Sequence, residues 1–143
     1  MRPYGAESEQ KIARHRTMRA EKGFITLERY LNVGGLSLPE RGGVALLECL
    51  CNLTANEMFD GGGAGADALR AVLRGIENLQ SQCETLIVVT NDVGGDGAVY
   101  SPATMAYIDV LGRINRLVAG RADRVTELVC GIPVPVKGEL LCV

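Results

Sequence analysis

The feature that most constrains the fold is the alternation of short apolar runs with longer amphipathic segments. The apolar runs lie at residues 44–47, 86–89 and 125–129, and each is bounded by turn or helix-start residues. Residues 67–80 carry apolar side chains at a helical period, and Ser101-Pro102 is typical of the start of a second helix that runs to about residue 119. This order predicts strand, helix, strand, helix, strand with right-handed crossovers.

We therefore expect an α/β fold with a three-layer, doubly wound, mostly parallel sheet, in which the first two runs form buried strands. The chain has 143 residues, of which 47% are apolar and only 4% aromatic. This composition favours one compact domain over residues 1–143 with an aliphatic core. In such folds, ligands bind at the carboxyl ends of the strands.

Charge, hydropathy and cysteine content exclude several classes of protein. A net charge of −2 gives no general attraction to nucleic acid, so we expect no nucleic-acid partner. No apolar stretch reaches the roughly 18 residues of a membrane span, and polar sequence follows Met1 instead of a signal peptide, which favours a cytoplasmic location. Five cysteines without a Cys-x-x-Cys pair, beside one histidine, predict reduced core thiols and no zinc site or other metal site built on sulfur.

The single histidine lies in a basic segment, residues 11–19, that contains four cations. If this segment is helical, Lys11, His15 and Arg19 share one face, with Arg16 beside them. Such a face could bind a triphosphate, and an imidazole with a pKa near about 6.5 could act as a nucleophile. The spacing alone more often indicates a solvated basic helix, which is the commoner case.

Polar residues follow the first two apolar runs. Glu48 closes the first run, where it is a candidate contact for magnesium or a nucleotide, or a carboxylate that caps the following helix. Thr90, Asn91 and Asp92 follow the second run and could orient a substrate or form an Asx turn. We expect both sets at the same edge of the sheet.

A glycine-rich stretch occupies residues 61–65, after a helical segment that ends at Phe59. A phosphate loop would follow a strand and continue into Lys-Ser or Lys-Thr, so we interpret this stretch as a flexible linker. The motif Gly-x-x-x-x-Gly-Lys-Ser/Thr occurs nowhere in the chain.

In their order, these motifs resemble the bifunctional adenosylcobinamide kinase and adenosylcobinamide-phosphate guanylyltransferase family of cobalamin biosynthesis. The family motif Arg-Ile-x-x-His-x-x-x-Arg is similar to residues 11–19, with Lys11 in place of the first arginine. Further similarities lie in Phe24-Ile25-Thr26-Leu27-Glu28, in Leu46-Leu47-Glu48-Cys49 with Asn56, and in Thr90-Asn91-Asp92-Val93-Gly94. Later ones are residues 112–115, 122–125 and 131–133, so the resemblance extends from residue 1 to about residue 138.

The resemblance implies that His15 takes GMP from GTP as a phosphoramidate and passes it to adenosylcobinamide phosphate. It also implies phosphorylation of adenosylcobinamide, GTP or ATP as substrate with Mg²⁺, and a homotrimer. The residues that it places against GTP are Arg16, Thr17, Met18, Arg19, Glu28 and Glu48. Guanidinium groups suit this role because their forked donors match phosphate oxygens.

The chain departs from the family pattern in two regions, the corrinoid side and the beginning of the sequence. Asp92 and Ile108 replace a usual Glu and Arg, and Val99 stands in a loop without the usual proline, which alters the corrinoid side. The family begins with a strand and a phosphate loop, whereas Met1 aligns with the exit of the second strand. We therefore expect a truncated phosphate-loop NTPase-like fold that lacks both features and has impaired activity. The alternative is a non-catalytic nucleotide- or corrinoid-binding protein.

Overall fold

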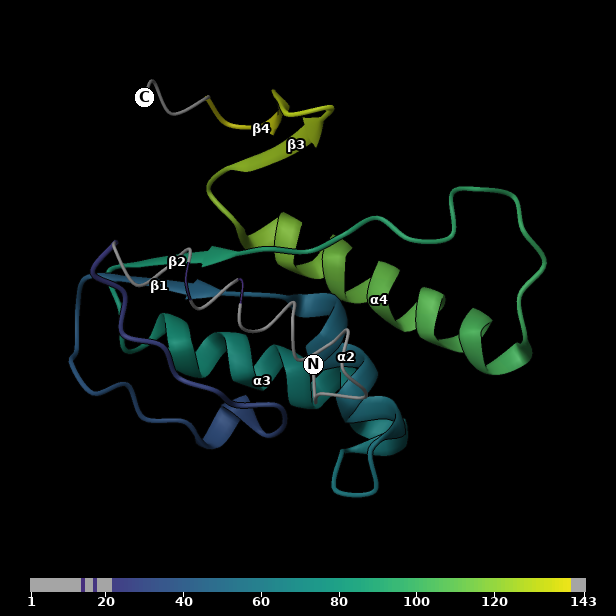
Figure 1. The fold of residues 1–143 in the computed structure, drawn as a ribbon, viewed down its shortest axis with the longest axis horizontal. Coiled ribbons are helices and arrows are strands. Elements are labelled where there is room, and N and C mark those ends of the chain that lie inside the picture. Colours follow the sequence, from purple (N-terminus) through teal and green to yellow (C-terminus); the bar gives the residue numbers. More distant parts are fainter. Residues whose placement is uncertain (1–13, 15–16, 18–21, 140–143) are drawn as a thin grey trace. The chain divides into compact units, whose positions relative to one another are not determined.

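The computed structural model describes residues 14, 17 and 22–139, and the chain divides after Asn91 into two compact units (Figure 1). Within the part described, no helix is both long enough and apolar enough to cross a bilayer. The fold is mixed α/β, with a parallel strand pair, an antiparallel strand pair and three α-helices among the described residues.

The first unit contains a parallel strand pair, β1 (Val44–Leu47) and β2 (Thr85–Val88). Their register runs from Val44 opposite Thr85 to Leu47 opposite Val88. The predicted bounds of β1 and the parallel pairing are confirmed, whereas β2 begins and ends one residue earlier than expected. The backbone N–H groups of Glu84 and Thr85 both donate to the Gly43 carbonyl, at 3.0 and 3.1 Å, so pairing starts as soon as the chain enters β2.

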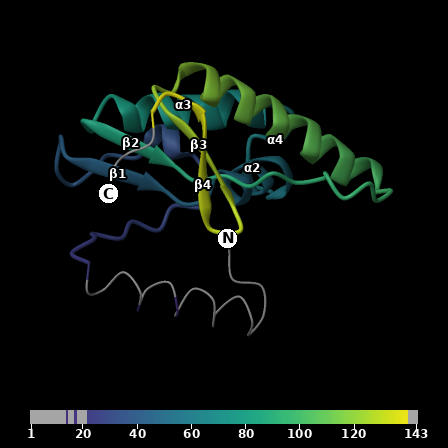
Figure 2. The same ribbon diagram turned by 90° about the horizontal axis from the view of Figure 1, so that it is seen from above.

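Two α-helices connect these strands. The helix α2 (Leu50–Phe59) leads through a short 3-10 turn, η2 (Gly65–Asp67), into α3 (Ala68–Gln80), which confirms the predicted helix over 67–80 except for its first residue. The buried residues of α3 lie on one face because they recur at helical spacing: Ala68, Val72, Gly75, Ile76 and Leu79. Figures 1 and 2 show α3 running along one face of the β1–β2 pair.

The two strands are less buried than the sequence predicted. Val44, Leu46 and Ile87 are 63%, 40% and 47% exposed, and burial alternates along both strands. A strand with a continuous apolar run is buried only if elements cover both of its faces, and in this unit α3 covers one face. The prediction of buried strands is therefore wrong for the face of the β1–β2 pair that α3 does not cover.

A loop before β1 packs against α3. Its 3-10 turn, η1 (Val33–Gly35), inserts the buried Val33 against Gly75, where a β-carbon would lie 3.0 Å from the Val33 Cβ. The Asn78 side chain donates to the carbonyls of Val33 (3.0 Å) and Leu36 (2.7 Å). The Gln82 amide donates to Leu36 and accepts from the Leu38 N–H. These amides fix the loop because they satisfy its backbone groups without a strand or helix.

The second unit begins with a long helix, α4 (Pro102–Arg121), and continues into a hairpin. The Ser101 hydroxyl accepts from the Thr104 N–H at 3.2 Å, so the predicted start at Ser101-Pro102 is confirmed. The helix ends two residues later than expected. Lys137 in the hairpin donates to carbonyls of the last turn of α4, where a cation is favourable.

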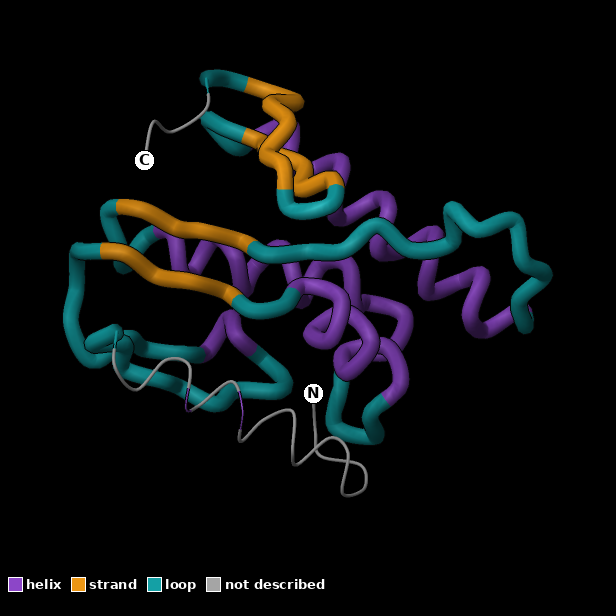
Figure 3. Tube along the Cα trace, turned by 45° about the horizontal axis from the view of Figure 1, so that its top comes forward, coloured by secondary structure: helices purple, strands orange, loops and turns teal. Residues whose placement is uncertain are grey.

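The third predicted strand does not join β1 and β2. Instead, β3 (Val125–Val129) pairs antiparallel with β4 (Ile132–Lys137) in a separate two-stranded sheet, coloured orange in Figure 3. Cys130 and Gly131, with φ of 52° and 82°, form a two-residue turn that reverses the chain. The expectation of one mostly parallel sheet is corrected, because this turn supplies a local partner for β3.

The glycine-rich stretch is a tight turn and not the flexible linker that we expected. The Gly62 N–H donates to the Asp60 carboxylate at 3.0 Å, and the Gly63 N–H donates to the Asp60 carbonyl at 2.9 Å. A β-carbon on Gly63 would lie 2.6 Å from the Glu57 carbonyl oxygen. The glycine is thus required by the close approach of the chain to the end of α2.

The cysteines differ from one another in burial. The four described cysteines are free, but only Cys51 is buried and Cys130 is exposed at the hairpin turn. The prediction of core thiols is therefore wrong for Cys130, because a turn follows its apolar run. Cys49 is the N-cap residue of α2, and Cys51 lies in the first turn of this helix.

Candidate nucleotide site at the end of β1

Most of the predicted guanylyl site lies outside the described residues. This applies to His15, Arg16, Met18 and Arg19. Thr17 is described; its backbone is helical and its side chain is exposed. Glu28 and Glu48 are described, and both are exposed.

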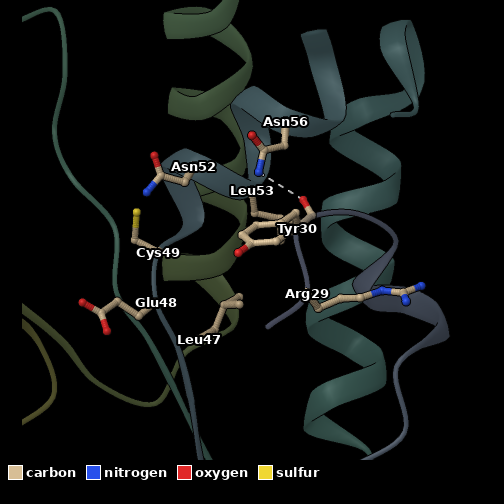
Figure 4. A pocket seen from close by; sticks show the side chains of 8 residues that line it. All are labelled: Arg29, Tyr30, Leu47, Glu48, Cys49, Asn52, Leu53 and Asn56. Carbon is tan, nitrogen blue, oxygen red and sulfur yellow. Dashed lines mark hydrogen bonds between the residues drawn. The ribbon is translucent and has the colours of Figure 1, made fainter. Parts of the chain in front are cut away.

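A small hollow lies where β1 passes into α2. Its volume is about 30 Å³, whereas pockets for small molecules typically measure about 300–1,000 Å³. It can therefore receive one part of a nucleotide and not the whole molecule. Eight residues line it (Figure 4): Arg29, Tyr30, Leu47, Glu48, Cys49, Asn52, Leu53 and Asn56.

Glu48 stands at the rim of this hollow, directly after β1. The N-cap position of α2 is occupied by Cys49 and not by Glu48, and no acidic residue lies in the first turn. Glu48 therefore lies one residue before the N-cap position of α2. Burial raises the pKa of the neighbouring Cys49 thiol, which keeps this sulfur protonated and a poor nucleophile.

The end of β2 lies beside the start of α2. The Asn91 N–H donates to the Cys51 sulfur at 3.1 Å, and the Thr90 hydroxyl lies 3.6 Å from the same sulfur. Cys51 therefore ties the polar exit of β2 to the helix that follows Glu48. The expected common edge of the two strand ends is confirmed for Thr90 and Asn91. The role of Cys51 was missed because its partners lie about forty residues away in the sequence.

Residues 28–32, which we call the arm, form another wall of the hollow. The Asn56 amide donates to the Tyr30 carbonyl at 3.2 Å, shown as the dashed line in Figure 4. The Tyr30 hydroxyl donates to the Glu28 carboxylate at 3.3 Å. The structure thus brings Tyr30 and Glu48 to the same hollow, although they are far apart in the sequence.

The two charged groups of the hollow do not face each other. In Figure 4 the Glu48 carboxylate points to one side and the Arg29 guanidinium to the opposite side. The Arg29 Nε donates to the Leu31 carbonyl at 2.8 Å, so this side chain closes the arm on itself. The two charged side chains therefore lie on opposite sides of the hollow.

Magnesium is the metal that the family resemblance implies at this site. The described residues contain no group of three or more His, Cys, Asp or Glu side chains that could hold a metal ion. Magnesium keeps several waters and commonly needs only one or two carboxylates, with substrate phosphates as further ligands. Glu48 is the one carboxylate among the residues that line the hollow, so the described lining is compatible with this kind of site.

The second unit contains the loop that the sequence linked to the corrinoid. The Asp96 carboxylate accepts from the Tyr100 hydroxyl at 2.6 Å and from the Ala98 N–H at 3.1 Å, and these bonds lower the pKa of Asp96. Ile108, which replaces the usual Arg of the family, packs against Gly94, where a β-carbon would lie 3.0 Å away. Ile108 thus makes an apolar contact with this loop at the position where the family usually has an arginine.

Comparison with known proteins identifies the family. Residues 2–136 match the family described as cobinamide kinase / cobinamide phosphate guanyltransferase. The chain is 31% identical over 137 residues to the bifunctional adenosylcobalamin biosynthesis protein CobP of Pseudomonas aeruginosa, an alignment that covers 94% of this chain and 78% of that protein. It is 30% identical over 144 residues to the bifunctional adenosylcobalamin biosynthesis protein CobU of Escherichia coli, covering 92% and 79% of the two chains. The chain belongs to the cobinamide kinase / cobinamide phosphate guanyltransferase family.

Proposed function

We propose that this chain transfers GMP from GTP to adenosylcobinamide phosphate during assembly of the nucleotide loop of cobalamin. The observation that carries the proposal is the family match over residues 2–136, which includes the basic segment around His15. The position of Glu48 at the rim of the hollow supports it, because this is the strand end at which the fold class binds ligands.

The proposed reaction has two displacement steps at one phosphorus. An imidazole nitrogen of His15 attacks the α-phosphorus of GTP, a P–N bond forms, and the P–O bond to pyrophosphate breaks with its electron pair on the leaving oxygen. A phosphate oxygen of adenosylcobinamide phosphate then attacks the same phosphorus, and the P–N bond returns its electron pair to nitrogen. The product carries a new pyrophosphate linkage, and His15 is regenerated.

The neighbours of His15 would stabilise the charge that builds up on phosphate oxygens. Arg16 and Arg19 supply forked N–H donors, which are strongest toward an ionised phosphate. Thr17 and Met18 would lie against the nucleotide, and Glu28 would contact it. Glu48 would contribute one oxygen ligand to magnesium delivered with the nucleotide.

The proposal also includes the second activity named in the family description, phosphorylation of the corrinoid with ATP or GTP as donor, and a homotrimer. It further includes a three-layer arrangement, in which helices cover both faces of the β1–β2 pair. The exposed face of the β1–β2 pair supports that arrangement, because Val44, Leu46 and Ile87 form an apolar surface of the kind that a second layer covers.

Intact-protein mass spectrometry tests the guanylyl step. The chain is incubated with GTP and magnesium in parallel with His15→Ala, and the masses are compared before and after acid treatment. We expect an acid-labile adduct of one GMP on the parent chain and none on His15→Ala. An adduct that persists in His15→Ala would overturn the assignment of the nucleophile.

A second candidate function is nucleotide binding without turnover. It is favoured by one observation: the hollow beside Glu48 lies at the strand end where this fold class binds ligands, and the Cys49 thiol that lines it is protonated and a poor nucleophile. Titration calorimetry with GTP separates the two functions. Binding with no covalent product supports the binding protein, whereas an adduct that depends on His15 excludes it.

A further inference from the structure

The geometry points to Glu57 as a positioning residue that holds the arm, residues 28–32, against α2 and thereby sets one wall of the hollow beside Glu48. Glu57 is not among the residues that the family resemblance placed at the nucleotide. The inference rests on the proposed function, because it concerns the same site.

Glu57 lies in the last turn of α2 and is only 3% exposed. Its two carboxylate oxygens accept from two different loops. Oε1 accepts from the Asn32 N–H at 2.7 Å, and Oε2 accepts from the Ala64 N–H at 3.0 Å. One side chain thus joins the end of the arm to the glycine-rich turn that follows the same helix.

These two hydrogen bonds compensate for the cost of burying the Glu57 carboxylate. Burial of a carboxylate is unfavourable unless hydrogen bonds or an opposite charge compensate for lost hydration. Within residues 14, 17 and 22–139, the partners of Glu57 are these backbone amides and not a cation. Because bonds to an ionised acceptor are stronger than neutral ones, displacement of Asn32 or Ala64 from this position is opposed.

The held end of the arm determines where its other residues lie. Asn32 has a left-handed backbone (φ 52°), so the chain turns sharply at the residue that Glu57 binds. Asn56, which precedes Glu57, binds the Tyr30 carbonyl, and Tyr30 and Arg29 both line the hollow. Adjacent side chains of α2 therefore fix both the turn of the arm and its contact with the site.

A matched control lies at the other end of the same loop. Asn78 of α3 donates to the carbonyls of Val33 and Leu36 and does not line the hollow. Replacement of Asn78 by Ala removes two bonds to this loop, whereas Glu57→Gln keeps one acceptor and turns an NH₂ group toward an N–H. Both changes weaken the loop, but only Glu57→Gln releases the arm.

The experiment measures three quantities for the parent chain, Glu57→Gln and Asn78→Ala. They are the single-turnover rate of GMP transfer from GTP, urea unfolding, and amide hydrogen exchange at Asn32 and Leu36. We expect Glu57→Gln to slow GMP transfer by at least about tenfold, the size associated with loss of a hydrogen bond to a charged group. Asn78→Ala should stay within about twofold of the parent at equal or greater loss of unfolding stability.

Hydrogen exchange separates failure of this inference from failure of the proposed function. We expect Glu57→Gln to accelerate exchange of the Asn32 amide and to leave that of Leu36, which donates to Val33, unchanged. If the parent chain forms no GMP adduct, the proposed function fails, and the exchange of these two amides still decides whether Glu57 holds the arm. Equal slowing of transfer in both variants, or unchanged Asn32 exchange in Glu57→Gln, overturns the inference.

Discussion

The two strand pairs of this chain begin from similar apolar runs but are held in different ways. The β1–β2 pair is joined through α2 and α3, is parallel, and has alternate residues half-buried. The β3–β4 pair is joined by two residues, is antiparallel, and every residue of β4 is exposed. The difference teaches that the connection after a strand, and not its apolar content, determines its pairing partner and its cover.

The largest expected difference is in the response to loss of an apolar side chain. Leu50 at the start of α2 is fully buried, whereas Leu128 of β3 is 71% exposed. We expect Leu50→Ala to lower the free energy of unfolding by about 2–5 kcal/mol, because it leaves a cavity. Leu128→Ala should cost less than about 0.5 kcal/mol. Urea denaturation measures both, and equal losses would contradict the comparison.

The connection between the first two strands can be tested at its tight turn. Gly63→Ala places a methyl group 2.6 Å from the Glu57 carbonyl oxygen, whereas a methyl on Gly61 meets nothing within 4 Å. We expect a cost of about 1–3 kcal/mol for Gly63→Ala, as for other overpacked sites, and a much smaller change for Gly61→Ala. Thermal unfolding of the two variants is compared. Similar melting temperatures would mean that this turn yields as a flexible linker would.

Substitutions in the hairpin turn should change the stability of the hairpin by a smaller amount, upward or downward depending on the residue. Cys130 has a positive φ of 52°, which is unfavourable for cysteine and better tolerated by asparagine. Cys130→Asn should stabilise the hairpin by up to about 1 kcal/mol, whereas Gly131→Ala should destabilise it by a similar amount. Exchange rates of the β3 and β4 amides report the change. Slower exchange in Gly131→Ala would show that the turn does not set this pairing.

The smallest effect concerns pH in the loop of the second unit. The hydrogen bond from Tyr100 lowers the pKa of Asp96, so its stabilisation is present above the unfolded pKa of about 3.9 and is lost as the pH falls through the folded pKa. Asp96 raises the pKa of Tyr100, so the contribution of Tyr100 is present below about 10 and is lost as the pH rises through its folded pKa. Carbon-detected NMR titration should show the Asp96 pKa rising in Tyr100→Phe, and an unchanged pKa would rule out this bond in solution.

Local patterns predicted much of the fold. The period of apolar residues located β1, α3 and β3, and Ser101-Pro102 located the start of α4, because each signal depends on neighbouring residues. The strand β4 was missed because Pro133 and Pro135 argue against a strand, although prolines are tolerated at an edge. The loop around η1 was missed because its amide partners in α3 lie more than forty residues away.

The candidate site was predictable to a similar degree. Glu48 was located because a carboxylate at the end of an apolar run has a defined place in a parallel sheet. Glu57 was not located, because an acidic residue in a helix usually faces solvent, and only its burial shows otherwise. The roles of His15 and its neighbours stay predictions from the family resemblance.

The two prolines of β4 have a consequence for self-association. Residues alternate in direction along a strand, and a proline has no N–H to donate. In the regular part of the β3–β4 register, Ile132 and Val134 are the β4 residues that donate toward β3, and the outward-facing positions are Pro133 and Pro135; the register then shifts, so that Lys137 pairs with Val125. That edge lacks the donors with which another extended chain would pair. On its β4 side, this hairpin with exposed valine and isoleucine side chains is thereby a poor template for fibril growth.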